Sequence, residues 1–266
     1  MTLSSTARRT LAVLTAAVLV LIYLPLLVVV LNSVNPNQSM TWPIEGVTFE
    51  WWRRAADSAG VREALATSLQ VAAIATGIAL VLGTLLALAL QRYSFFGKHS
   101  VNLLVILPIA LPGVVTGIAL NNGFRGILGI DLSLWTIVIA HATFCIVTVF
   151  NNVQARLRRM GTSLEEASAD LGAGVFTTFR LVTLPQLRSA LLAGGMLAFA
   201  LSFDEIIVTT FTAGGGANTL PIWILNNMFR PNQAPVVNVV AVVLILFSIV
   251  PVWLAQRLSS DVEAAR

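Results

Sequence analysis

Six long runs of apolar residues dominate the sequence and limit what the chain can fold into. A helix needs about 20 apolar residues to cross the hydrocarbon core of a bilayer. The runs that come near this length are residues 11–31, 64–90, 101–120, 132–153, 189–211 and 236–254. Charged residues make up only 11% of the 266 residues, too few to cover a soluble globule of this size. The sequence therefore predicts an all-α integral membrane protein with six transmembrane helices, in one domain that covers residues 1–266.

Prolines are expected to shape some of these helices. Pro25, Pro108, Pro112 and Pro251 fall inside the apolar runs. A proline lacks a backbone N–H and kinks a helix, and neighbouring helices can satisfy the carbonyl groups that it frees. We therefore expect kinks at these positions.

The basic residues predict the orientation of the helices. If the N-terminus is cytoplasmic, eleven Lys and Arg residues lie on the cytoplasmic side and five on the other. Cytoplasmic loops carry such an excess of basic residues. We therefore predict that both termini are inside (N-in/C-in) and that the segments 32–63 and 212–235 are outside. The first of these segments contains Trp42, Trp51 and Trp52, which suit the membrane interface.

The sequence offers little for catalysis or metal binding. Its single cysteine, Cys145, excludes an intrachain disulfide and a cysteine-based metal cluster. His99 and His141 are 42 residues apart and match no metal-ligand spacing. His141 could relay protons, but we favour a neutral side chain that bonds across helices. We predict no catalytic residue, no metal site and no cofactor bound by this chain, and the net charge of +4 does not indicate nucleic acid as a partner.

The cytoplasmic segment 156–186 is longer than a link between two helices requires. Ser163 and Glu166 have the spacing of a capping box, which predicts a short helix that starts there. Gly172 follows this helix and is expected to end it. A second amphipathic run stops at Pro185, and its apolar side carries Phe176, Phe179 and Val182. Exposed apolar surface of this kind either binds a partner protein or lies on the lipid surface.

The spacing in this segment resembles the EAA loop of bacterial ABC importer permeases. The family pattern reads Glu-Ala-Ala, three residues, Gly, nine residues, Ile, one residue, Leu-Pro. Here Ser168 replaces the second Ala and Val182 replaces the Ile. The resemblance implies a type I ABC importer permease fold, with a coupling loop that docks on a separate ATP-hydrolysing subunit. The docking residues implied are Glu165, Glu166, Ala167, Ser168, Gly172, Val182, Leu184 and Pro185.

Four further segments resemble the spermidine/putrescine permease branch of that family. They are LPIALPGVVTGIAL (107–120), HATFCIVTVF (141–150), LSFDEIIVTTF (201–211) and TLPIWILNNMF (219–229). The resemblance implies a multi-pass inner-membrane permease, surrounded by membrane lipid, that imports polyamines by alternating access. Relatives that import iron(III), 2-aminoethylphosphonate or opines share much of these segments, so another cargo remains an alternative.

The same resemblance implies the partners. They are a homologous permease subunit that completes a heterodimer, two copies of an ABC ATPase subunit, and an extracytoplasmic substrate-binding protein. The ATPase subunits would use the ATP and Mg²⁺. The chain itself cannot form a P-loop, because its single lysine, Lys98, is followed by His99 instead of Ser or Thr.

Two adjacent acids, Asp204 and Glu205, stand inside the fifth apolar run. A charge at the centre of a span costs about 2.5–3.5 kcal/mol, so such a residue is by default functional. Carboxylates in a low-dielectric pathway attract an ammonium group strongly, and we predict that these acids line the substrate pathway. Consecutive helical residues point about 100° apart, so only one should face the cavity, and the family pattern favours Asp204.

Other roles for the two acids remain open at this point. They could pair with Arg or backbone donors in a subunit interface, or lean outward to the water boundary. A membrane-embedded enzyme built on Asp204 and His141 is a remote alternative, since no nucleophile motif lies beside them. A purely structural subunit would leave the EAA spacing unexplained.

Overall fold

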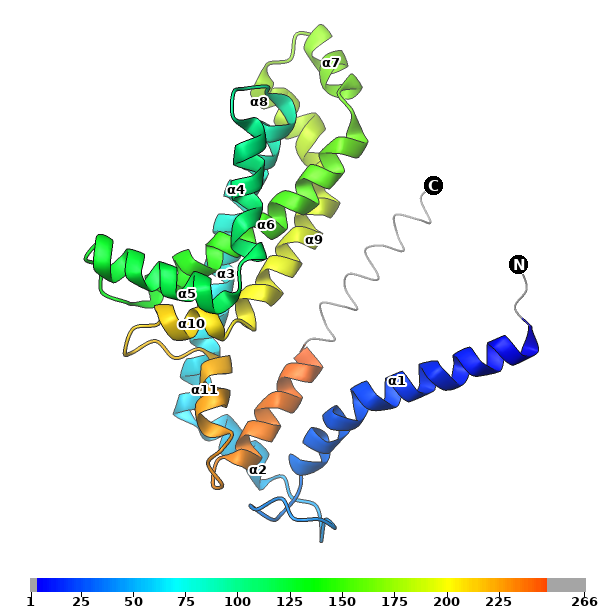
Figure 1. Cartoon of the computed structure of the whole chain (residues 1–266), viewed down its shortest axis with the longest axis vertical. Coiled ribbons are helices and arrows are strands. Elements are labelled where there is room, and N and C mark those ends of the chain that lie inside the picture. The colour runs from blue at the N-terminus through cyan, green and yellow to red at the C-terminus, as the bar shows by residue number, and fades with distance from the viewer. Residues whose placement is uncertain (1–3, 248–266) are drawn as a thin grey trace. The chain divides into compact units, whose positions relative to one another are not determined.

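The structure is a computed structural model, described here for residues 4–247, and it contains no strand in that range (Figure 1). The prediction of an all-α protein is therefore confirmed for this part of the chain. The labelled helices are α1 (Ser5–Asn32), α2 (Glu50–Asp57), α3 (Ala59–Arg92), α4 (Lys98–Ala110), α5 (Gly113–Asn121), η1 (Asn122–Ile127), α6 (Leu134–Met160), α7 (Ser163–Asp170), α8 (Val175–Thr178), η2 (Phe179–Thr183), α9 (Leu184–Phe203), α10 (Ile207–Thr212) and α11 (Leu220–Asn227), where η1 and η2 are π-helical. A further helix, Ala234–Phe247, follows α11.

The contacts divide the chain into two compact units. One unit consists of Met1–Arg62 with Ile224–Arg266, and the other of Glu63–Trp223. The candidate site residues all lie in the second unit. The prediction of one membrane domain stays a prediction.

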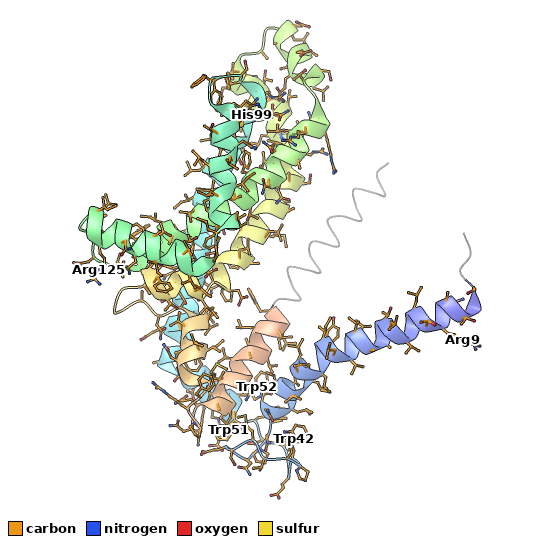
Figure 2. The ribbon with its side chains drawn as sticks, viewed as in Figure 1. Arg9, Trp42, Trp51, Trp52, His99 and Arg125 are labelled. Carbon is orange, nitrogen blue, oxygen red and sulfur yellow. The ribbon has the colours of Figure 1, made fainter. Side chains whose placement is uncertain are left out.

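In the first unit, Trp51 holds together the segment between α1 and α2. Its indole Nε1 donates a hydrogen bond to the carbonyl oxygen of Asn35 at 2.8 Å, and the side chain is buried. Trp42, by contrast, is exposed (Figure 2). Trp51 is therefore a core residue of this segment, and the prediction that the tryptophans lie at the membrane interface stays a prediction.

Among the described residues, four helices are long and apolar enough to cross a membrane. They are Thr6–Asn32, Ala59–Arg92, Leu134–Met160 and the continuous stretch Val175–Phe203. A fifth span requires that α4 and the helix after it count as one, although the two are bent by 104°. The last predicted run, 236–254, falls partly outside the described residues, and the shorter apolar helix Ala234–Phe247 covers its first part. The count of six spans and the orientation stay predictions.

The third predicted span, 101–120, is two helices instead of one. The cause is Pro112, which fixes its own φ and disfavours the helical conformation of the residue before it. Leu111 is accordingly extended, with φ −82° and ψ 145°. Pro25 and Pro108 lie inside continuous helices, so they do not interrupt the chain in this way.

The fifth predicted span, 189–211, is also wrong at both ends. The helix begins earlier, because Val175 to Phe203 is continuous and Pro185 does not end it. A π-turn precedes the proline, and in it the N–H of Leu184 donates to the carbonyl of Phe179. This wider turn gives the proline ring room that a regular α-helix lacks. At the other end the helix stops at Phe203, and α10 begins only at Ile207.

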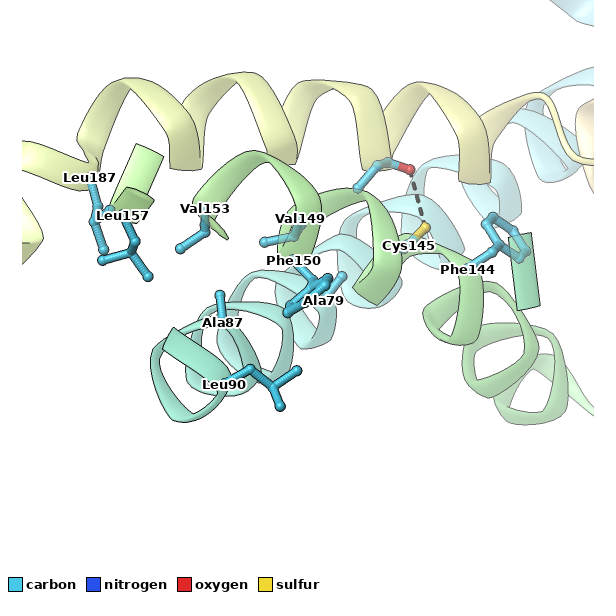
Figure 3. Close-up of a cluster of buried hydrophobic side chains, with 11 residues drawn as sticks. Ala79, Ala87, Leu90, Phe144, Cys145, Val149, Phe150, Val153, Leu157 and Leu187 are labelled. Atoms are coloured by element: carbon cyan, nitrogen blue, oxygen red, sulfur yellow. Dashed lines mark hydrogen bonds between the residues drawn. The ribbon is translucent and has the colours of Figure 1, made fainter. Parts of the chain in front are cut away.

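The core of the second unit lies where α6 crosses α3 and α9 (Figure 3). Small residues allow this close approach, as is typical of helices in membranes. A Cβ on Gly83 of α3 would lie only 2.9 Å from the carbonyl oxygen of Ile146 on α6. The buried side chains are Ala79, Ala87, Leu90, Phe144, Cys145, Val149, Phe150, Val153, Leu157, Leu187 and Ala198.

Candidate functional site

The segment predicted to dock on a partner forms two short helices, α7 and α8. Gly172 ends the first of them in the left-handed region, with φ +79°, as expected for a glycine after a helix. Glu165 and Glu166 lie in the first turn, where the helix dipole favours acids. The predicted capping box is wrong, however. The N-cap is Thr162 instead of Ser163, and no side chain caps this helix.

Glu165 clamps α7 to its neighbours. Its Oε1 accepts hydrogen bonds from Arg92 Nη2 at 2.6 Å and from Thr183 Oγ1 at 2.8 Å. The Arg92 and Glu165 side chains are only 19% and 22% exposed, so solvent screens this ion pair less than a fully exposed one. One carboxylate therefore joins the end of α3, the first turn of α7 and η2. Sequence reasoning placed Glu165 on the docking surface and missed Arg92 and Thr183.

Apolar side chains remain exposed on this segment. Leu171 is 89% exposed and Phe176 is 74% exposed, whereas Phe179 and Val182 are half-buried. Beside them, α3 and the segment enclose an open groove of about 650 Å³ that Arg92 and Phe176 both line. The expected apolar face therefore exists, although Phe179 and Val182 turn partly inward. Docking on a partner stays a prediction.

The two apolar runs that are broken into separate helices, 101–120 and 189–211, pack against each other. α10 lies beside α5 (Figure 1), and a Cβ on Gly117 would come within 2.6 Å of the Phe211 ring. Asn121 Nδ2 donates to the carbonyl oxygen of Phe211 at 2.5 Å. At the other end of the pair, a Cβ on Gly113 would touch Ile207 at 3.5 Å. The two places where the chain leaves the helical conformation therefore lie close together.

Asp204 and Glu205 stand at one of these breaks, so the prediction that they lie within a continuous helix is wrong. Asp204 is the C-cap of α9, with φ −96° and ψ 3°. Its side chain is exposed and makes no ion pair or hydrogen bond within residues 4–247. The half-buried Glu205 instead accepts a hydrogen bond from the backbone N–H of Val208 at 2.8 Å. Glu205 thus bonds the first turn of α10 through one of its two carboxylate oxygens, whereas the Asp204 side chain has no partner in this part of the chain.

His141 of α6 contacts both sides of the same break. Its Nδ1 lies 2.8 Å from Ser202 Oγ on α9, and its Nε2 lies 2.9 Å from Thr209 Oγ1 on α10. These are the cross-helix bonds expected of a neutral histidine. Asp204 is not among its partners, so the catalytic pair of the enzyme alternative is not formed. Within the described residues, no group of three His, Cys, Asp or Glu side chains could hold a metal ion.

Comparison with known proteins gives a consistent picture. A family profile described as "Binding-protein-dependent transport system inner membrane component" matches residues 79–264. The spermidine/putrescine transport system permease protein PotC of Escherichia coli (strain K12) is 32% identical over 246 residues, which cover 92% of each chain. The putrescine transport system permease protein PotI of the same strain is 32% identical over 84% of this chain and 81% of its own.

A solved structure shows the same fold. It is the crystal structure of a bacterial ABC transporter involved in the import of the acidic polysaccharide alginate, and one of its chains superposes with a TM-score of 0.72. The match covers 98% of this chain and 99% of the other, at 16% identity. A likeness at this identity extends to the fold alone.

The ion pair between Arg92 and Glu165 leads to a first prediction. Arg92→Gln removes the ion pair with Glu165, which should contribute about 1 kcal/mol at this exposure. Backbone amides of α7 should then exchange hydrogen up to about fivefold faster, as measured by mass spectrometry on the purified protein. Arg54→Gln is the matched control, because it breaks the ion pair with Glu50 in the other unit. Unchanged α7 exchange in Arg92→Gln would show that this contact does not hold the segment.

Proposed function

The chain belongs to the family of binding-protein-dependent transport system inner membrane components, and we propose that its cargo is a polyamine such as spermidine or putrescine. Family membership makes the chain a permease subunit of an ABC importer in the inner membrane, and not an enzyme. The relatives PotC and PotI, which are named for spermidine and putrescine, support a polyamine as the cargo.

The observation that carries this proposal is the position of Asp204. A carboxylate in an apolar run is costly, at about 2.5–3.5 kcal/mol near the bilayer centre, so it is by default functional. Non-helical backbone at membrane depth is tolerated where it is buried in protein or lines a water-filled cavity. Asp204 ends its helix, is exposed and has no partner among the described residues. These properties fit a side chain that faces a cavity and is available to bind a cation.

A polyamine supplies the matching charge. Each of its ammonium groups is a compact cation that a carboxylate attracts strongly where little water screens the interaction. Glu205 adds charge nearby, but its Oε1 is engaged by the Val208 N–H. Asp204, whose carboxylate has no partner among the described residues, is therefore the cargo contact, and Glu205 keeps α10 in place beside it.

The partners complete the cycle. A homologous permease subunit forms the other half of the pathway, a substrate-binding protein delivers the polyamine from outside, and two ATPase subunits use ATP and Mg²⁺ in the cytoplasm. When the ATPase subunits close, they move the segment that contains α7 and α8. The continuous helix from Val175 to Phe203 transmits this movement to Asp204, and the Arg92–Glu165 ion pair transmits it to α3.

A second prediction concerns the docking segment. Gly172→Val places a β-branched residue at φ +79°, whereas Gly174→Val places the same residue at φ −71°. Neither glycine has a neighbouring atom that a new Cβ would meet within 4 Å. A left-handed conformation costs an L residue about 1–2 kcal/mol, so Gly172→Val should reduce co-purification with the ATPase about fivefold or more. Gly174→Val should leave it unchanged, and equal retention in both variants would rule out this surface as the dock.

A third prediction tests the cargo contact. Asp204→Asn keeps the size of the side chain but removes its charge, so polyamine uptake should fall about tenfold or more, equivalent to about 1.4 kcal/mol. Glu205→Gln should have a smaller effect, because its amide oxygen can still accept from the Val208 N–H. Uptake is measured in reconstituted vesicles at matched protein levels, together with assembly of the complex.

The outcomes separate the alternatives. Full polyamine uptake by Asp204→Asn would refute the cargo contact. If the Asp204→Asn importer fails to assemble instead, Asp204 stabilises a subunit interface. Uptake of an anionic solute in place of polyamines would show that the fold serves another cargo.

A further inference from the structure

A buried chain of hydrogen bonds surrounds the break beside Asp204 and has no part in the function proposed so far. It joins Ser202, His141 and Thr209, whose side chains are all 3% exposed or less. Thr209 Oγ1 also donates to the carbonyl oxygen of Glu205 at 2.8 Å. The chain therefore runs from α9 through α6 to α10, and then to the backbone of the break itself.

Counting hydrogens gives the direction of each bond. A threonine hydroxyl has one hydrogen, and Thr209 uses it on the Glu205 carbonyl. Thr209 Oγ1 must therefore accept from His141 Nε2–H. This leaves Nδ1 of the neutral ring without a hydrogen, so it accepts from the Ser202 hydroxyl. Every donor in the chain has an acceptor, and hydrogen bonds aligned in this way strengthen one another.

The anchored atoms bracket Asp204. Ser202 lies two residues before it, and the Glu205 carbonyl lies immediately after it. His141 belongs to α6, which supplies much of the buried core, including Phe150 and Val153. We propose that the buried hydrogen-bonded chain of Ser202, His141 and Thr209 holds the Asp204 carboxylate in the cargo pathway. The inference rests on the proposed function only in taking Asp204 as the cargo contact.

Satisfying the backbone of the break does not require a histidine. Thr210 and Thr212 of the same short helix donate to the carbonyl groups of Ile206 and Val208, four residues earlier, without help from α6. Thr209 could satisfy the Glu205 carbonyl in the same local way. The two further bonds, from His141 to Thr209 and to Ser202, instead join α9 and α10 to α6. They therefore fix the position of the break relative to α6.

Two variants of Thr209 test this positioning. Thr209→Val keeps the shape of the side chain but removes the hydroxyl, whereas Thr209→Ser keeps the hydroxyl. In vesicles with the assembled importer, Thr209→Val should raise the KM for spermidine about fivefold or more with little change in the maximal rate. Thr209→Ser should retain the normal KM. Thr210→Val is the matched control and should also retain it, because the Thr210 hydroxyl bonds to the Ile206 carbonyl, four residues earlier, and not to α6. A normal KM in Thr209→Val would overturn the proposal, as would a loss confined to the maximal rate.

A double-mutant cycle shows whether the effect passes through Asp204. If it does, adding Thr209→Val to Asp204→Asn should raise the KM no further, because coupled residues are not additive. A full fivefold increase in the Asp204→Asn background would show that Thr209 acts by another route.

A labelling experiment tests whether the side chain at position 204 is held in place, even if Asp204 does not bind the cargo. Cys145 is buried, so Asp204→Cys introduces a single accessible cysteine. A small cationic thiol reagent should modify it at least threefold more slowly with Thr209→Val than with Thr209→Ser, because the side chain leaves the cavity. Equal or faster labelling with Thr209→Val would overturn the positioning role. Normal spermidine uptake by Asp204→Asn would instead overturn the cargo contact, and the labelling result would still stand.

Discussion

Backbone groups that leave the helical conformation inside an apolar run must find hydrogen-bond partners in the protein, and this constraint organises the second unit. At the break after Phe203, Glu205 accepts from Val208 N–H and Thr209 donates to the Glu205 carbonyl. The other break, at Pro112, packs against α10 with glycines at the contact. Glu205 thus takes part in both of these local bonds, whereas the Asp204 carboxylate is exposed and has no partner among the described residues.

The same arrangement connects the two ends of the unit. The continuous helix Val175–Phe203 begins in the segment with the exposed apolar side chains and ends at Asp204. At about 1.5 Å per residue it reaches across a bilayer. A π-turn lets Pro185 lie inside this helix without interrupting it. Under the proposed function, one continuous helix therefore joins the docking segment to the cargo contact.

Some features set by neighbouring residues could be predicted from the sequence, whereas the pairing of distant residues could not. The helical class followed from the apolar runs, and the end of α7 followed from Gly172, since a glycine marks a local change of backbone. The break at Asp204 was missed because no Pro or Gly stands next to it, so the apolar run was taken as one helix. The spacing of Glu205 and Val208 is that of a capping contact and could have signalled it. His141 finds Ser202 and Thr209 across 61 and 68 residues, and no local pattern predicts such pairs.

The central claim is that Asp204 faces the pathway and binds a cationic cargo, while Glu205 maintains the fold beside it. An experimental structure of the assembled importer with spermidine bound tests this most directly. The account predicts an ammonium nitrogen within about 3 Å of an Asp204 carboxylate oxygen, with Glu205 still accepting from Val208 N–H. An Asp204 side chain paired with an arginine of the partner permease, with spermidine bound elsewhere, would contradict it.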